Sequence, residues 1–143
     1  MKAIRAHEFG GPEKLKLEVI DDPVAGPGEV VIDVRAAGVN PSDVYMLSGN
    51  YALIPTLPYV PGYDAAGIVS AVGGGVSEFS VGDRVLTCPG IGKQDDKPDL
   101  GITGCFAEKV LRKAADIRAL PDTVSFGQGA AIGVPFVTAH HAL

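Results

Sequence analysis

The chain has 143 residues, of which 46% are hydrophobic and 20% charged, and it carries a net charge of −5. These values are typical of one globular domain and exclude intrinsic disorder. The acidic balance, without a cluster of Lys or Arg, argues against nucleic acid and anionic membranes as partners. The apolar runs are too short to span a bilayer, and no signal peptide is evident. Two isolated cysteines suit a reducing compartment, so we expect a cytoplasmic protein.

Strands dominate the first half. Short strands are predicted at 3–6, 14–19 and 29–37, because apolar residues alternate with polar ones in the longer two. One helix of two turns is predicted at 42–48, with Asn40 or Ser42 as its N-cap and Pro41 near its first position. Gly49 is expected to end this helix.

The second half begins with strands and ends with helices. A continuous apolar strand is predicted at 65–72, followed by a triple-glycine turn and a strand within 81–86. A polar, Gly-rich surface loop is expected at 90–104, with strands at 105–111 and 117–120 and helices at 125–132 and 134–143. Six or seven short strands predict a mainly β barrel or sandwich with a few helices.

Metal and nucleophile chemistry find little support in the sequence. His140 and His141 are adjacent, and neighbouring side chains on a helix point about 100° apart, so both cannot face one ion. Cys88 and Cys105 lack CxxC partners and an evident base, which favours packing roles for both. The triple glycine leads into another strand rather than a helix, so no dinucleotide-binding turn is predicted.

The stretch 38–67 holds all four tyrosines beside two polar residues of the predicted helix start. An amphipathic ring can line a pocket for a planar ligand, or it can cap a core beneath a long loop. The residues alone favour packing over a pocket, and both alternatives stay open at this point. The side chains in question are Asn40, Asp43, Tyr45, Tyr51, Tyr59 and Tyr63.

Several motifs resemble the medium-chain dehydrogenase/reductase superfamily. They are MKAI at 1–4, PGEV at 27–30, AGVNPSD at 37–43, PYVPGYDAAG at 58–67 and VGDRV at 81–85. SGNY at 48–51 and GAAIGVPFVTA at 129–139 are similar to the zinc-independent quinone oxidoreductases of the zeta-crystallin type. The motifs occur in family order and cover nearly the whole chain.

The resemblance implies that both zinc sites of the related alcohol dehydrogenases are absent. Where those enzymes have a metal-binding Cys and a His-Glu pair, this chain has Asn40 and Tyr63-Asp64. A neutral amide and a phenol cannot replace thiolate and imidazole at tetrahedral zinc. The region matching the four-cysteine lobe keeps only Cys88 and Cys105. No metal is therefore expected.

The resemblance also implies the fold and the activity. It indicates a GroES-like, partly open β-barrel at 1–122 and a helical linker at 123–143 toward an NADPH-binding domain that this chain does not contain. We therefore expect the catalytic-domain portion of an NADPH-dependent quinone oxidoreductase, inactive as a fragment and able to form a homodimer at full length. An enone or enoyl reductase of the same superfamily is the first alternative. A non-catalytic GroES-like binding module is the second.

By family analogy the cleft is lined by residues of 40–59 and of the linker helix. The amide of Asn40 is expected to hold ligand or cofactor, and Tyr51 to form an aromatic wall or donate to a quinone oxygen. The resemblance implies catalytic roles for Asn40 and Tyr51, substrate contacts for Tyr45, Tyr51 and Tyr59, and cofactor contacts for Asn40, Asp43, Tyr45 and Thr138.

Overall fold

The computed structural model describes residues 1–88 and 103–143, so most of the predicted loop at 90–104 lies outside the described residues. Within the described part, the chain forms seven strands, three α-helices and two 3-10 turns. In order these are β1 (Lys2–Ala6), η1 (Pro12–Lys14), β2 (Leu15–Val19), β3 (Glu29–Gly38), α1 (Pro41–Leu47), β4 (Asp64–Val72), β5 (Arg84–Thr87), β6 (Lys109–Lys113), η2 (Ala114–Asp116), β7 (Ile117–Ala119), α2 (Phe126–Ala130) and α3 (Gly133–His141).

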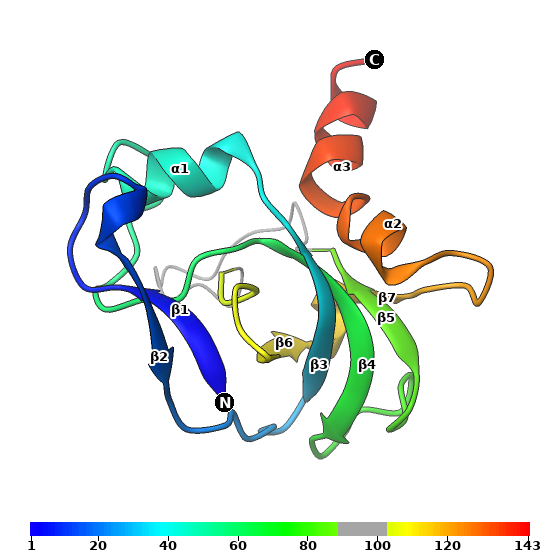
Figure 1. Cartoon of the computed structure of the whole chain (residues 1–143). Coiled ribbons are helices and arrows are strands. Elements are labelled where there is room, and N and C mark those ends of the chain that lie inside the picture. The colour runs from blue at the N-terminus through cyan, green and yellow to red at the C-terminus, as the bar shows by residue number, and fades with distance from the viewer. Residues whose placement is uncertain (89–102) are drawn as a thin grey trace.

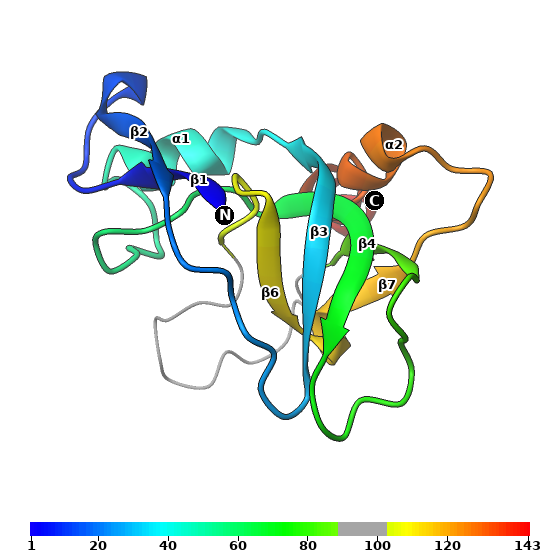
Figure 2. The ribbon, with the colours of Figure 1, turned by 60° about the horizontal axis from the view of Figure 1, so that its bottom comes forward.

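The strands form a curled half-barrel (Figure 1). Five antiparallel strands follow the order β6-β3-β4-β5-β7, and β1 and β2 form a separate two-stranded sheet. The backbone of β1 joins the two-stranded sheet to the segments that precede β4 and β6, since Ile4 N–H donates to Phe106 O at 2.8 Å and Ala6 pairs with Tyr59. The view in Figure 2 shows β3 and β4 bending together across the middle of the molecule. The predicted partly open, GroES-like barrel is confirmed.

The main core lies inside the curl and comes from the apolar faces of β3 to β7. Its fully buried members include Val30 and Ile32 of β3, Val69 of β4 and Val85 of β5. The predicted alternation in β3 holds only in part, because Val31 is buried as well. The pairing register of β3 with β4 shifts between Val31 and Ile32, which breaks the regular alternation of faces.

The predicted strand at 105–111 is wrong at its beginning, because β6 starts at Lys109. The preceding residues divide their hydrogen bonds between two segments instead of joining one ladder. Cys105 N–H donates to Gly62 O at 3.1 Å and Phe106 N–H to Pro61 O at 3.0 Å, while Phe106 O accepts from β1. This stretch therefore crosses from one sheet to the other. Local alternation does not reveal such a crossing.

The helices follow the sequence closely. The predicted helix at 42–48 is α1, one residue earlier. Ser125 caps α2, with its Oγ accepting from Gln128 N–H at 3.2 Å. The helices predicted at 125–132 and 134–143 correspond to α2 and α3. Across the described ranges, no helix has the length and apolar character that crossing a membrane requires.

Close approach of β3 and β4 depends on Gly67. A Cβ at this position would lie 2.1 Å from the carbonyl oxygen of Asp33, a backbone atom that cannot rotate away. At Gly74, in the turn after β4, a Cβ would meet nothing within 4 Å. An alanine substitution therefore meets a backbone clash at Gly67 and open space at Gly74.

We predict that Gly67→Ala lowers the free energy of unfolding by about 1–3 kcal/mol, because the strands must separate to admit the methyl group. Gly74→Ala should change it by less than about 0.5 kcal/mol. Urea denaturation of both variants beside the parent chain measures the difference. Equal stability of the two variants would contradict the close packing at Gly67.

Candidate functional site

The candidate site begins where β3 ends and α1 starts. Of the two predicted candidates, Asn40 rather than Ser42 is the N-cap of α1, and Pro41 occupies the first turn. The backbone N–H of Asn40 donates to Asp43 Oδ2 at 2.8 Å, which is the return half of a capping box. Both side chains are only 5% exposed. The polar start of this helix is therefore turned inward.

Asp64, the first residue of β4, ties this helix start to α3. Its Oδ2 accepts from Asn40 Nδ2 at 2.9 Å. Val134 N–H, in the first turn of α3, donates to both carboxylate oxygens at 3.0 and 3.1 Å. The residue is 0% exposed, so its charge is satisfied by protein groups rather than by water.

Burial raises the pKa of both carboxyl groups. For Asp43, desolvation raises the pKa most and the nearby charge of Asp64 adds to it, while the hydrogen bond from the Asn40 backbone opposes the shift. For Asp64, desolvation again raises the pKa, and the Asn40 side chain and the Val134 backbone oppose the shift. Two carboxyl groups with raised pKa values thus lie beneath the helix start.

Tyr59 and Tyr63 lie in the core rather than on the surface, each 7% exposed. Tyr59 pairs with Ala6 of β1 through its backbone, and its hydroxyl finds no hydrogen-bond partner among the described residues. Burial raises the pKa of Tyr59 to about 12 and raises that of Tyr63 further. The hydroxyl of Tyr63 faces Met46 Sδ at 3.9 Å. Both tyrosine rings therefore pack in the core instead of facing solvent.

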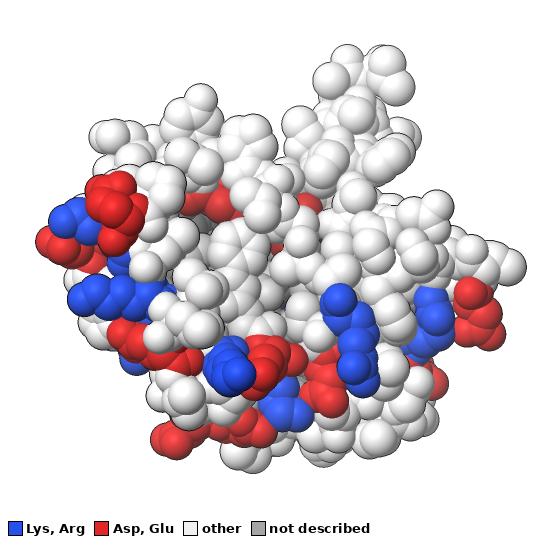
Figure 3. All heavy atoms as spheres, viewed as in Figure 1, with Lys and Arg blue, Asp and Glu red and all other residues white. Residues whose placement is uncertain are grey.

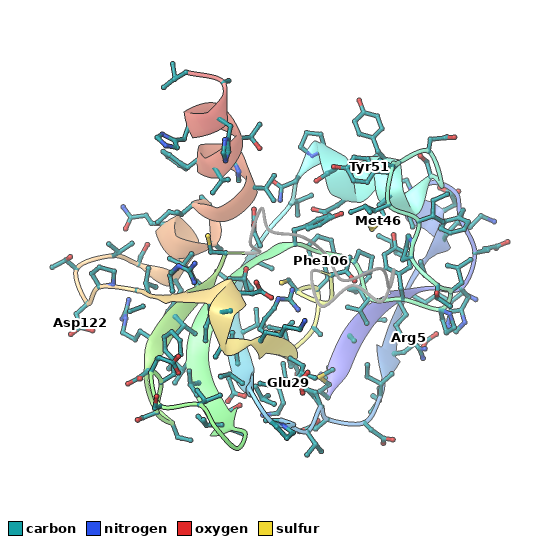
Figure 4. The ribbon with its side chains drawn as sticks, turned by 180° about the vertical axis from the view of Figure 1, so that it is seen from behind. Arg5, Glu29, Met46, Tyr51, Phe106 and Asp122 are labelled. Carbon is teal, nitrogen blue, oxygen red and sulfur yellow. The ribbon has the colours of Figure 1, made fainter. Side chains whose placement is uncertain are left out.

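Tyr45 and Tyr51 remain accessible, at 56% and 37% exposure. Figure 4 shows Tyr51 beside α1 and Met46 between this helix and Phe106. Thr138 is exposed on α3. The structure therefore brings Asn40 and Asp43 together in the interior, leaves Tyr45 of α1 and Tyr51 of the following loop exposed, and places Thr138 on a separate helix.

In the view of Figure 3, α1 and α3 present no Lys, Arg, Asp or Glu at the surface, and α3 ends in the exposed His140 and His141. Figure 3 shows only white spheres over these two helices, with red spheres recessed between them and the blue ones farther down. Large exposed apolar side chains occur on α1, on the residues around it and on α3. They are Val39, Val44, Tyr45, Tyr51, Ile54, Phe136 and, just after α3, Leu143. Around α1, such a surface suits an uncharged, planar ligand or a second protein surface.

The donor set here does not fit zinc. Asn40 Nδ2 already donates to Asp64, and the Tyr63 hydroxyl is enclosed against Met46. In the segments 1–88 and 103–143, no three His, Cys, Asp or Glu side chains gather in a group that could hold a metal ion. Cys105 is buried, with its thiol 3.2 Å from Tyr63 O and accepting from Arg112 Nη2 at 3.0 Å.

In the sequence analysis, Asp64 appears only as part of the pair that replaces the His-Glu pair of the zinc enzymes, and no role is assigned to it. A signal was present: a carboxylate opens a continuous apolar strand directly after a Pro-Gly turn. A charge at the start of a buried strand needs hydrogen-bond partners. The sequence gives no indication that one partner lies 70 residues away at Val134.

Known proteins resemble this chain over its full length. Residues 26–122 match the family described as Alcohol dehydrogenase GroES-like domain. The quinone oxidoreductases of Pongo abelii and Homo sapiens are each 44% identical over 144 aligned residues, which cover 100% of this chain and 40% of the relative.

Two solved quinone oxidoreductases are similar in structure. The protein from Coxiella burnetii has a TM-score of 0.88 at 33% identity, covering 100% of this chain and 44% of that one. The Escherichia coli protein, complexed with NADPH, has a TM-score of 0.82 at 32% identity, covering 100% and 40%. The chain thus spans less than half the length of these relatives.

We predict that Tyr59→Phe leaves the free energy of unfolding unchanged or raises it by up to about 1 kcal/mol, because the lost hydroxyl has no partner. Tyr59→Ala should lower it by about 3–5 kcal/mol, since the ring fills the core. Urea denaturation separates the two effects. A marked loss of stability in Tyr59→Phe would show that the hydroxyl makes a hydrogen bond, and would contradict the view that Tyr59 contributes only by packing.

We also predict a pH dependence that distinguishes two aspartates. Because the folded-state pKa of Asp43 is raised above its ordinary value of 3.8, the folded state binds more protons, and stability falls as pH rises through the window between the two values. Asp43→Asn should therefore reduce the decline in stability from pH 4 upward.

The matched control is Asp33→Asn. Lys109 Nζ lies 2.7 Å from Asp33 Oδ1 and lowers the pKa of that carboxyl, so its stabilisation is present at neutral pH and lost on acidification. Asp33→Asn should lower the free energy of unfolding by less than about 1 kcal/mol at pH 7 and leave it unchanged at low pH. Parallel stability curves for the Asp43 variant and the parent, measured by urea denaturation across pH, would refute the shift at Asp43.

Proposed function

Because the chain belongs to the family of alcohol dehydrogenase GroES-like domains, within the medium-chain dehydrogenase/reductase superfamily, we propose that it is the catalytic-domain portion of an NADPH-dependent quinone oxidoreductase. The observation that carries the proposal is the buried amide of Asn40, oriented by Asp64 beneath an uncharged surface. The quinone oxidoreductases that match the whole chain support the choice of acceptor.

The residues present fit the nicotinamide end of NADPH and not its phosphates. A carboxamide ring needs an uncharged wall and a fixed polar group, which the surface of α1 and the Asn40 amide offer. α1 carries no basic residue in its last turn, and its N-terminus is occupied by Asp43. A second, nucleotide-binding domain of the same protein would therefore hold the phosphates. When bound, NADPH supplies the hydride that reduces the quinone.

The residues of this chain then bind and align rather than react. Asn40 holds ligand or cofactor through its amide, and Asp43 keeps the Asn40 backbone in place. Tyr51 forms an aromatic wall or donates a hydrogen bond from its hydroxyl to a quinone oxygen, and Tyr45 of α1 contacts the substrate. Thr138 contacts the cofactor from α3. Tyr59 supports this wall from the core, because its ring is buried.

The exposed apolar residues of α3 support a neighbouring domain. Phe136 is among the large exposed apolar side chains, and most of α3 beyond its first turn is exposed. Apolar surface of this kind marks contacts with another protein surface. We propose that α3 packs against the nucleotide-binding domain, which closes the cleft and excludes water from the acceptor.

The test is turnover by the full-length protein with NADPH and 1,4-benzoquinone, and with an enone at equal concentration. We expect quinone reduction, and none by residues 1–143 alone. Asn40→Ala should lower kcat/KM by about 100-fold, since a misplaced ligand reacts poorly. The matched control, Asn50→Ala, removes an exposed amide that donates to Ser48 Oγ at 3.5 Å, and should leave turnover unchanged.

Three outcomes would overturn the proposal. Faster reduction of the enone would move the activity to the alternative class of reductases. Robust turnover by the fragment would contradict the need for a second domain. Equal effects of the Asn40 and Asn50 variants, with folding verified by circular dichroism, would remove Asn40 from the site.

A further inference from the structure

We propose that Asp64 is a positioning residue that sets the direction of the Asn40 amide and seats α3 with the same carboxylate. The proposal rests on the function proposed above and adds to it a link between the site and the helix that leads out of the barrel. Its basis is one fully buried side chain that accepts hydrogen bonds from two segments far apart in sequence.

The chain is shaped around this carboxylate. A Cβ on Gly133 would lie 2.1 Å from Asp64 Oδ1, so only glycine lets α3 begin this close. A Cβ on Gly38, which pairs with Asp64 in the β3–β4 ladder, would lie 2.6 Å from Ala130 O and 3.1 Å from Asp64 Cβ. Two glycines on different elements thus clear the space that Asp64 and its partners occupy.

The carboxylate fixes the direction of the amide. An ionised carboxylate only accepts hydrogen bonds, so the end of Asn40 that faces it must be the NH₂ group. The carbonyl oxygen of Asn40 is then directed away from Asp64. An uncharged amide at position 64 can both donate and accept, so it no longer imposes this orientation on Asn40. Asp64 therefore determines which polar atom of Asn40 reaches a ligand.

The same carboxylate anchors α3. The first N–H groups of a helix lack acceptors within the helix, and Asp64 supplies one to Val134. Within the described part of the chain, these are the hydrogen bonds that join α3 to the sheet. A displacement of α3 would therefore pull on the group that orients Asn40. The position of the linker helix and the direction of the site amide are mechanically coupled.

If Asp64 had a purely structural role, any donor–acceptor pair at positions 40 and 64 would restore activity. Exchanging the side chains of Asn40 and Asp64 therefore separates a structural role from a positioning role. Asp64→Asn turns its new NH₂ group either toward the NH₂ of Asn40, which forces Asn40 to reverse, or toward Val134 N–H, which weakens the contact with α3. Asn40→Asp places two carboxylates against each other. In the double variant Asn40→Asp with Asp64→Asn, the pair again has one donor and one acceptor. The amide introduced at position 64 keeps a carbonyl oxygen that can accept from Val134, but position 40 now presents a carboxylate.

The experiment uses the full-length protein with selectively ¹⁵N-labelled Asn and Val. We expect both single variants to lower Tm, to shift the Val134 amide resonance, and to lower kcat/KM for 1,4-benzoquinone by about tenfold or more. In Asp64→Asn, the Asn40 side-chain resonances should also move wherever the new NH₂ group faces Asn40. The double variant should recover Tm and the Val134 resonance, while kcat/KM stays low. Asp122→Asn, an exposed carboxylate distant from Asn40, is the control and should behave like the parent.

Recovery of both Tm and kcat/KM in the double variant would overturn the proposal, because Asp64 would then only complete a buried pair. Unchanged Asn40 and Val134 resonances in Asp64→Asn would overturn it as well. Failure of the parent protein to reduce quinones would contradict the proposed function alone, since the resonances still report whether Asp64 orients Asn40 and seats α3.

Discussion

A carboxylate with no contact to water organises this half-barrel. Asp64 is fully buried, and a buried charge is tolerated only where hydrogen bonds replace those lost to solvent. Asn40 and Val134 provide these bonds, so the end of β3, the start of α1 and the first turn of α3 must meet at one place. The position of the candidate site follows from that requirement.

The chemistry proposed for the domain is one of alignment. Its uncharged surface, with an oriented amide below and tyrosines of α1 and the following loop beside it, suits a planar acceptor and the nicotinamide end of a cofactor. A quinone is already a good electron acceptor, so the protein contributes mainly by placing two rings together and excluding water. Phosphate binding and closure of the cleft are assigned to a second domain.

Local patterns predicted much of this fold. Alternation indicated the strands around β2 and β3, and a candidate N-cap followed by Pro41 indicated the start of α1. The start of β6 was missed, because Phe106 bonds to two different segments and period-two alternation cannot show that. The role of Asp64 was missed for a related reason: its partner Val134 is distant in sequence, and only tertiary packing brings them together.

The most direct test of the account is a crystal structure of the full-length protein with NADPH bound. The account predicts that the nicotinamide ring lies against Asn40 and the tyrosines of α1 and the following loop, with Asp64 still bonded to Asn40 Nδ2 and Val134 N–H and with α3 packed on the second domain. A ring bound elsewhere, or a second domain that buries Asn40 and Tyr51 without leaving a cleft, would contradict it.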